Sequence, residues 1–394
     1  MPVEPPIINL HAYAKVKHRF GLRCQSVIEI KVHPDTAAKQ PPKRFEEAYA
    51  VLRTAIAERA FPGCAFGLLV KGEVVLLDAL GQFTYEPDAP AVTPETLYDV
   101  ASLTKVASTT SAAMLLYQRG LLDLEMRVGD LLPGFVIGRD PAEHAREVTI
   151  RHLLAHSSGL PGYKPLFHTA TTAYGVLRGC LDMPLEALPG TRVEYSDHGF
   201  ILLGKALEAI TREYLATWAK REVMTPLGMG ASRYCPHPVI RPEIPPTEVD
   251  ELFRQRLIQG EVQDEHAYLL KGAGGHAGLF SNAPDLLRFS KAILEPGPDS
   301  FFRRETVDLF ATRQPPAGSG RALGWDTPSG ESSAGHYFSA DSIGHLGYSG
   351  CSLWIDRRDN LAVVLLTNRT WPNRESQLIR TVRPAFHDAL RKAL

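Results

Sequence analysis

The sequence predicts an α/β (α+β) fold in which the two chain ends form one antiparallel sheet flanked by helices. A mainly helical region is inserted between those ends. Near the N-terminus, "CAFGLLVKGEVVLLDAL" is typical of two strands joined by a turn at Lys71-Gly72. Near the C-terminus, "CSLWID" and "LAVVLLTNR" are typical of strands around the polar turn "RRDN". The long middle of the chain shows helical spacing of its apolar residues, interrupted by irregular loops.

The elements follow in order from an N-terminal extension, residues 1–42, which ends at a Pro-Pro pair. A first helix is expected over residues 43–60, ended by Pro62-Gly63. Further helices are expected over 102–119, 148–155, 198–221 and 284–294, with a last helical stretch from about Glu375. Residues 43–394 are predicted to form one domain. Its α/β part is expected at about 43–90 and 285–394, and its helical part at about 91–284.

Bulk composition excludes several function classes. The 394 residues include 43 basic and 44 acidic ones, a balance that gives no support to nucleic-acid or membrane-surface binding. No apolar run reaches the roughly 20 residues of a transmembrane segment. The five cysteines are scattered without a C-x-x-C pair and predict neither a disulfide framework nor a zinc site. No export signal is visible, so the chain as written is expected to be cytoplasmic, and exported if the true start differs.

The stretch "YDVASLTKVASTTSAAMLLYQRG" places Ser102 three residues before Lys105. One interpretation is a helix start, with Ser102 as N-cap and Gly120 as the stop. The other is a nucleophile and its base, because residues three apart share a helix face and serine needs an adjacent base. Desolvation lowers the pKa of a partly buried lysine and lets it accept a proton, and a helix N-terminus suits an oxyanion. A single S-x-x-K also arises by chance.

Two later stretches favour the catalytic interpretation. "VEYSDHGF" places Tyr195 just before a helix, and "SIGHLGYSG" places His345 and Gly347 just before the terminal strands. Ser-x-x-Lys, Tyr-Ser-Asp and His-x-Gly, in this order, resemble the three motifs of the serine β-lactamase and penicillin-binding-protein superfamily. The forms that the three motifs take in this chain resemble those of the class C branch of the superfamily, which has relatives among D-Ala-D-Ala carboxypeptidases and esterases. The resemblance covers about residues 43–394 and implies a β-lactamase/transpeptidase-like fold.

The resemblance implies a role for each motif residue. Ser102 would attack a carbonyl and become acylated, while Lys105 and Tyr195 would share the proton transfers. His345 would hold the electropositive side of the site. With an ordinary pKa near ~6.5, this histidine is expected to change charge around neutrality.

The same resemblance implies that the backbone N–H groups of Ser102 and Tyr348 form the oxyanion hole. Gly347 would be small so that substrate can lie against the strand backbone. It implies no cofactor and no metal. The expected partner is a small-molecule or peptide substrate, with no nucleic acid, and the oligomeric state stays open.

Two positions depart from the family pattern. Asp197 stands where many relatives have an asparagine whose amide binds the substrate, and an ionised carboxylate cannot donate. Either Asp197 contacts substrate, or it or Ser196 caps the helix that begins near His198. Leu346 replaces a threonine whose hydroxyl binds a substrate carboxylate in relatives. Both changes weaken the case for tight recognition of penicillins, but they leave acylation intact.

The sequence therefore predicts a serine hydrolase that cleaves an ester or amide through a Ser102 acyl-enzyme. The favoured substrates are those of an esterase or a D-amino-acid peptidase. A true β-lactamase is the alternative enzyme. A penicillin-recognising sensor that acylates without turnover is the alternative from another class.

Other motifs are expected to be structural. Ser349 in "GYSGC" lacks the strand–turn–helix context of a nucleophile elbow. Gly272–Ala277 is expected to be a turn that brings a loop close to the active site, and not a dinucleotide site. His152 and His156 have zinc-motif spacing without the glutamate, so a helix end is favoured. Asp264-Glu265 could reach the cleft as polar lining, but a solvated helix face is favoured.

Overall fold

A six-stranded sheet is built from both ends of the chain. The computed structural model describes residues 28–32, 43–140 and 144–394. The sheet has the order β1 (Lys31–Val32), β3 (Glu73–Gly81), β2 (Gly63–Val70), β11 (Leu361–Thr367), β10 (Ser352–Asp356), β9 (Ser342–Leu346). All neighbours are antiparallel except β1 and β3. Because β2 pairs with β11, the N-terminal hairpin and the C-terminal strands share one sheet, which confirms the predicted fold class.

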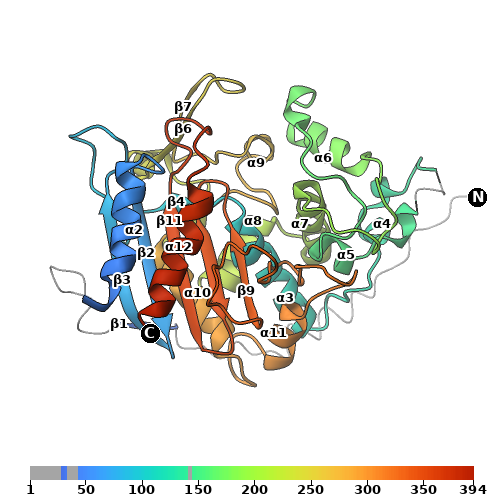
Figure 1. The fold of residues 1–394 in the computed structure, drawn as a ribbon. Helices are drawn as coiled ribbons and strands as arrows, with labels where there is room; N and C mark the ends of the chain where they lie inside the picture. The colour runs from blue at the N-terminus through green and yellow to red at the C-terminus, as the bar shows by residue number, and fades with distance from the viewer. Residues whose placement is uncertain (1–27, 33–42, 141–143) are drawn as a thin grey trace, which may run out of the picture.

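Helices cover both faces of this sheet. The helices α2 (Glu46–Ala57) and α12 (Ile379–Lys392) lie side by side on one face (Figure 1). The helix α10 (Ala283–Leu294) packs on the other face, against β2 and β11. Alternate residues of β2 point to the two sides, so Phe66 belongs to the core under α2 and α12 and Ala65 to the larger core. At Gly67, an added Cβ would lie 2.7 Å from Leu287, so α10 packs tightly there.

The middle of the chain forms a mainly helical region beside the sheet (Figure 1). Its helices are α3 (Ser111–Gln118), α4 (Val128–Leu131), α5 (Ile150–Leu154), α6 (Ala173–Leu181), α7 (Asp197–Thr211), α8 (Leu215–Ala219) and α9 (Glu265–Leu269); α11 (Arg304–Ala311) packs against α3. The helix expected over 102–119 starts with a π-helical turn, Lys105–Thr110, that continues into α3. The helix expected over 198–221 is broken where Arg212 adopts a left-handed conformation with φ 58°.

Two small sheets complete the fold. The first joins β4 (Tyr98–Asp99), β8 (Leu279–Ser281) and β5 (Arg233–Tyr234), and the second is the hairpin of β6 (Pro246–Asp250) and β7 (Arg256–Gln259). Pairing of β4 with β8 brings the segment before Ser102 beside the loop that precedes β8. This pairing assembles the site described below from segments that are far apart in the sequence.

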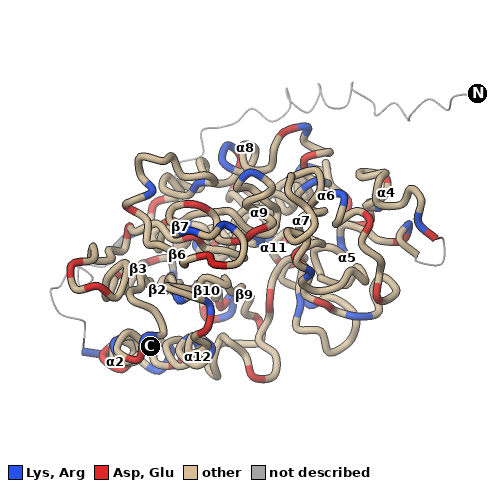
Figure 2. The backbone as a smooth tube through the Cα atoms, turned by 90° about the horizontal axis from the view of Figure 1, so that it is seen from above, with Lys and Arg blue, Asp and Glu red and all other residues tan. Residues whose placement is uncertain are grey.

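The remaining predictions have mixed outcomes. The predicted extension, residues 1–42, lies outside the described residues except for 28–32, and the division into two structural parts stays a prediction. The last helix begins at Ile379, a few residues later than expected. Among the described residues, no helix is both long and apolar enough to cross a membrane. Basic and acidic residues are interspersed along the described chain (Figure 2).

Candidate active site

Ser102 follows Ala101, whose strained backbone is held by a hydrogen bond to Asp99. Ala101 has a left-handed φ of 46°, which costs energy for a residue with a Cβ. Its N–H donates to the buried Asp99 carboxylate at 2.9 Å, and the Gln263 N–H donates to the same carboxylate at 2.7 Å. Burial raises the pKa of Asp99 to about 6. Asp99 therefore fixes the turn that presents Ser102, and no motif in the sequence pointed to this role.

The Lys105 ammonium is fully buried and uses all three of its N–H groups. Its Nζ lies 2.9 Å from Ser102 Oγ, 2.6 Å from Asp197 Oδ1 and 3.1 Å from the His276 carbonyl oxygen. Burial alone lowers the pKa of Lys105, but the Asp197 carboxylate and Tyr195 outweigh it and the net shift is upward. The expectation that desolvation makes Lys105 a ready proton acceptor is therefore wrong. In the resting site Lys105 is a cation that donates to Ser102.

Asp197 is the counterion of Lys105. The predicted cap is confirmed for Ser196, which accepts the Gly199 N–H at 3.3 Å as the N-cap of α7, while a substrate contact of Asp197 stays a prediction. Asp197 is the first residue of α7, and its carboxylate points to Lys105. Burial raises the pKa of Asp197, but Lys105 opposes it and the net shift is downward.

Replacing Asp197 by asparagine is expected to move the acid limb of the pH–rate profile to lower pH. The negative charge of Asp197 raises the pKa values of both Lys105 and Tyr195, so its removal lowers both. Whichever of the two accepts the Ser102 proton then deprotonates at lower pH, by about 1–3 units for a close charge pair. The measurement is kcat/KM against pH for both proteins, and an unmoved acid limb would contradict the assigned pairing.

Tyr195 lies between the lysine and the sheet. The Lys105 ammonium is 4.9 Å from the centre of its ring, and its hydroxyl interacts with both Lys105 and Ser102. Burial raises the pKa of Tyr195, although Lys105 opposes that shift, so the resting group is a phenol. His156 packs against the ring in a tilted arrangement, with 4.6 Å between the ring centres, and accepts the Ser196 N–H at 3.1 Å. The His156 ring thus holds the segment that carries Tyr195.

The expectation for the charge of His345 is wrong. The residue sits on β9 with its ring 5.9 Å from that of Tyr195, as its motif predicts. Burial, with Lys105 and Arg321 nearby, lowers the pKa of His345 to about 3. A neutral imidazole cannot provide the electropositive side of the site. Arg321 provides a positive charge instead, with its guanidinium 5.1 Å from the Tyr195 ring, and sequence reasoning missed it.

His345 is therefore expected to stay neutral from about pH 5.5 to 8. Its imidazole resonances, assigned by comparison with His345→Gln, should show no titration over this range because the folded protein excludes the charged form. The same substitution should leave the shape of the pH–rate profile unchanged over the range. A titration midpoint near 6.5 would show that the ring carries the charge that the family resemblance implied.

Two residues of the cavity wall have backbone N–H groups without an acceptor in the described part of the chain. Among the described residues, neither the Ser102 N–H nor the Tyr348 N–H has a hydrogen-bond acceptor, and both residues line the same cavity. This placement fits the predicted oxyanion hole. Gly347 also has a packing reason for its size, since an added Cβ would lie 2.5 Å from the Val100 carbonyl oxygen, and the expected substrate contact stays a prediction. The glycine lets the end of β9 pack against the segment that carries Ser102.

The cavity has a volume of about 610 Å³. Charged groups on its wall are Asp197, Asp264, Glu265, Asp326, Arg321, Arg369, Arg374, Arg380 and Arg383. The prediction of a solvated face for Asp264-Glu265 is wrong, because both residues line this cavity and Glu265 is buried in an ion pair with Arg374 at 2.7 Å. The loop 272–277 reaches the site as predicted, since the His276 carbonyl accepts from Lys105.

One group of possible metal ligands lies beside the cavity. Within the described part of the chain, Asp264, His266 and His276 place potential ligand atoms within 4.8 Å of one another. However, His266 Nε2 accepts the Leu166 N–H at 3.0 Å, and His276 Nε2 lies 2.7 Å from Asp264 Oδ1. These two nitrogens have protein partners, whereas the Nδ1 atoms of both rings are buried and have no hydrogen-bond partner among the described residues. The group therefore holds Asp264 by a hydrogen bond and leaves one imidazole nitrogen of each histidine unpaired within that part of the chain.

Ser349 and His152 have the structural roles that the sequence predicts for them. Ser349 is buried and donates to the Asp99 carbonyl at 2.7 Å, which removes it from the cavity. His152 accepts the Thr149 N–H at the start of α5. Both residues stabilise local backbone.

Comparisons with known proteins identify the family of this chain. A family model described as Beta-lactamase matches residues 48–384. An "N-acetylmuramyl-L-alanine amidase" of Bacillus subtilis (strain 168) is 30% identical over 406 aligned positions, 92% of this chain and 89% of that one. A "Putative D-alanyl-D-alanine carboxypeptidase" of Escherichia coli (strain K12) is 31% identical over 306 positions, 70% of each chain. A penicillin-binding-protein homologue from Caulobacter crescentus has the same fold, with TM-score 0.70, 18% identity and coverage of 91% and 99%.

The fold and the family matches define a serine hydrolase. The chain belongs to the β-lactamase family, as its three ordered motifs predict.

Proposed function

We propose that this chain hydrolyses an amide bond in fragments of peptidoglycan through an acyl-enzyme on Ser102. The bond that we favour joins the lactyl carboxyl group of N-acetylmuramic acid to L-alanine. The observation that carries the chemistry is the buried Ser102–Lys105–Asp197 hydrogen-bond chain beside two free backbone donors. The 30% identity to the Bacillus subtilis amidase over 92% of the chain supports the substrate class.

Each motif residue has a step in this mechanism. In the reactive form the Tyr195–Lys105 pair has lost one proton to solvent, which leaves Tyr195 as a phenolate beside the Lys105 ammonium. Ser102 Oγ attacks the amide carbonyl carbon, and its proton passes to this phenolate. The Ser102 and Tyr348 N–H groups stabilise the oxyanion that forms on the carbonyl oxygen. Collapse of the intermediate breaks the C–N bond, and the leaving amine takes the proton from the pair. Water then attacks the acyl ester, releases the acid and returns the proton to Ser102.

Once ionised, Tyr195 is the better placed acceptor of the serine proton. Lys105 is an ammonium that donates three hydrogen bonds, so it has no lone pair that could take this proton. As a cation beside Tyr195, Lys105 stabilises the phenolate that a proton transfer requires. Lys105 and its counterion Asp197 then set how readily Tyr195 ionises.

A carboxypeptidase acting on D-Ala-D-Ala ends is the second candidate. Arg321 and Arg380 line the cavity and could hold a terminal carboxylate, and the Escherichia coli relative covers 70% of the chain. Product analysis separates the two, with N-acetylmuramyl-L-alanine and a peptide ending in D-Ala-D-Ala as substrates. Release of L-alanine from the first, and no release of D-alanine from the second, is expected. Release of D-alanine alone would favour the carboxypeptidase, and stoichiometric acylation by penicillin without turnover would favour a sensor.

A further inference from the structure

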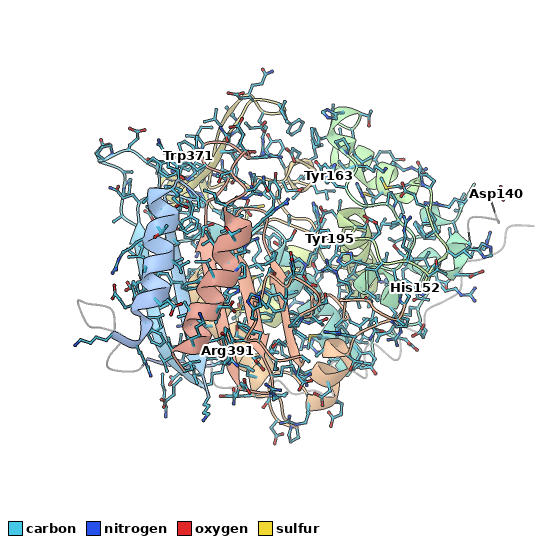
Figure 3. All side chains as sticks on the ribbon, in the orientation of Figure 1. Asp140, His152, Tyr163, Tyr195, Trp371 and Arg391 are labelled. Carbon is cyan, nitrogen blue, oxygen red and sulfur yellow. The ribbon has the colours of Figure 1, made fainter. Side chains whose placement is uncertain are left out.

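The cavity wall contains two side chains that the acyl-transfer steps do not use, Tyr163 and Gln263. They come from separate segments, the loop after α5 and the loop before α9. Figure 3 shows Tyr163 and Tyr195 together between the sheet and the helices α6 and α7. The surroundings of Tyr163 and Gln263 indicate that these two side chains contact a ligand.

The loop that carries Tyr163 is held by two histidines. The two ring nitrogens of His198 lie 3.1 Å from the carbonyl oxygens of Gly162 and Lys164, and the neutral ring donates to one of them. Further along, His266 Nε2 accepts the Leu166 N–H at 3.0 Å. Tyr163 itself is 49% exposed. An exposed aromatic ring on a fixed backbone is pre-organised, so a ligand that lies on it pays little ordering entropy.

Gln263 offers a donor without a protein acceptor. The residue is 4% exposed, and among the described residues its Nε2 has no hydrogen-bond partner. Its backbone is fixed because its N–H donates to Asp99 at 2.7 Å. A buried donor without a partner is costly, and a carbonyl group of a bound ligand would satisfy it. Asp197 cannot serve as such a donor, since its carboxylate accepts from Lys105.

We propose that Tyr163 and Gln263 form a subsite for an N-acylated sugar ring of the substrate. The apolar face of the ring lies on Tyr163, and the carbonyl oxygen of the N-acyl group accepts from Gln263 Nε2. Aromatic platforms with a few placed polar groups are the usual composition of small-molecule sites. This inference rests on the proposed function, because the N-acetylmuramyl group supplies both the ring and the acetamido carbonyl.

Two substrates that differ only in the sugar test the subsite. N-acetylmuramyl-L-alanine and D-lactyl-L-alanine share the scissile lactyl–alanine amide. The quantity to compare is the ratio of kcat/KM for the first substrate to kcat/KM for the second. Tyr163→Ala and Gln263→Leu are each expected to lower this ratio at least tenfold, mainly through KM for the muramyl compound. Tyr163→Phe keeps the ring and should stay within about twofold of the unmodified protein.

The matched control is Tyr337→Ala, because Tyr337 is also 49% exposed but does not line the cavity. It should leave the ratio unchanged. An unchanged ratio in Tyr163→Ala and Gln263→Leu, with hydrolysis of the muramyl compound intact, would overturn the subsite and leave the proposed function standing. If the unmodified protein does not hydrolyse N-acetylmuramyl-L-alanine, the proposed function fails and the sugar assignment fails with it.

Discussion

Ser102→Ala is expected to lower kcat by about four orders of magnitude or more, the scale seen when a serine nucleophile is removed. The loss is this large because the acyl-enzyme cannot form, and the remaining groups only bind and polarise the carbonyl. Substrate affinity should change little, since the cavity wall stays intact. The measurements are steady-state hydrolysis of the muramyl compound and calorimetric binding to the inactive variant.

Ser349→Ala is the matched control for that loss. Ser349 is a second serine near the end of β9, but it is buried and bonded to the Asp99 carbonyl. It should retain hydrolysis within about tenfold, because the lost hydrogen bond affects packing and not the reaction. Retention of more than about 1% of kcat in Ser102→Ala would show that another group attacks the substrate.

Lys105→Met is expected to lower kcat about a thousandfold or more and to destabilise the fold at the same time. The activity falls because Tyr195 loses the cation that stabilises its phenolate. The stability falls because Asp197, whose side chain is 16% exposed, loses its partner at 2.6 Å. Breaking a fully buried ion pair costs about 3–5 kcal/mol, and the cost is expected to be smaller here because the carboxylate is partly exposed. Urea unfolding measures the free energy, and steady-state kinetics measure kcat.

The double variant Lys105→Met/Asp197→Asn separates the two effects. Removing the orphaned charge should restore most of the free energy of unfolding, because the methionine–asparagine pair carries no buried charge. Hydrolysis should stay abolished, since the proton-transfer cation is still missing. A double variant that regained activity together with stability would show that Lys105 acts only as a structural partner of Asp197.

The sequence predicts the parts of this protein that depend on local pattern. Alternating apolar residues and turn residues identified the strands at both chain ends, and pairing of β2 with β11 follows from their apolar faces. The order of the three motifs brought Ser102, Lys105, Tyr195 and His345 into one family pattern, and the structure places them around one cavity. The catalytic roles themselves remain predictions.

The charge states could not be predicted from the sequence, because they depend on neighbours that only the fold brings close. The direction of the pKa shift of Lys105 depends on its short distance to Asp197, which is 92 residues away in the sequence. The pKa of His345 depends on how deeply its ring is buried, which the sequence does not show. The same holds for Tyr163 and Gln263, which belong to no motif and meet only at the cavity. The solvated face predicted for Asp264-Glu265 failed for this reason as well.

Hydrolysis by this route requires transfer of the acyl group of the substrate to Ser102. Intact mass spectrometry of protein quenched during turnover of N-acetylmuramyl-L-alanine detects this intermediate. We expect a mass increase equal to the N-acetylmuramyl acyl group, located by peptide mapping on Ser102 and absent from Ser102→Ala. Steady hydrolysis with no acylated species, even under rapid acid quench and in the slowed Lys105→Met variant, would contradict it.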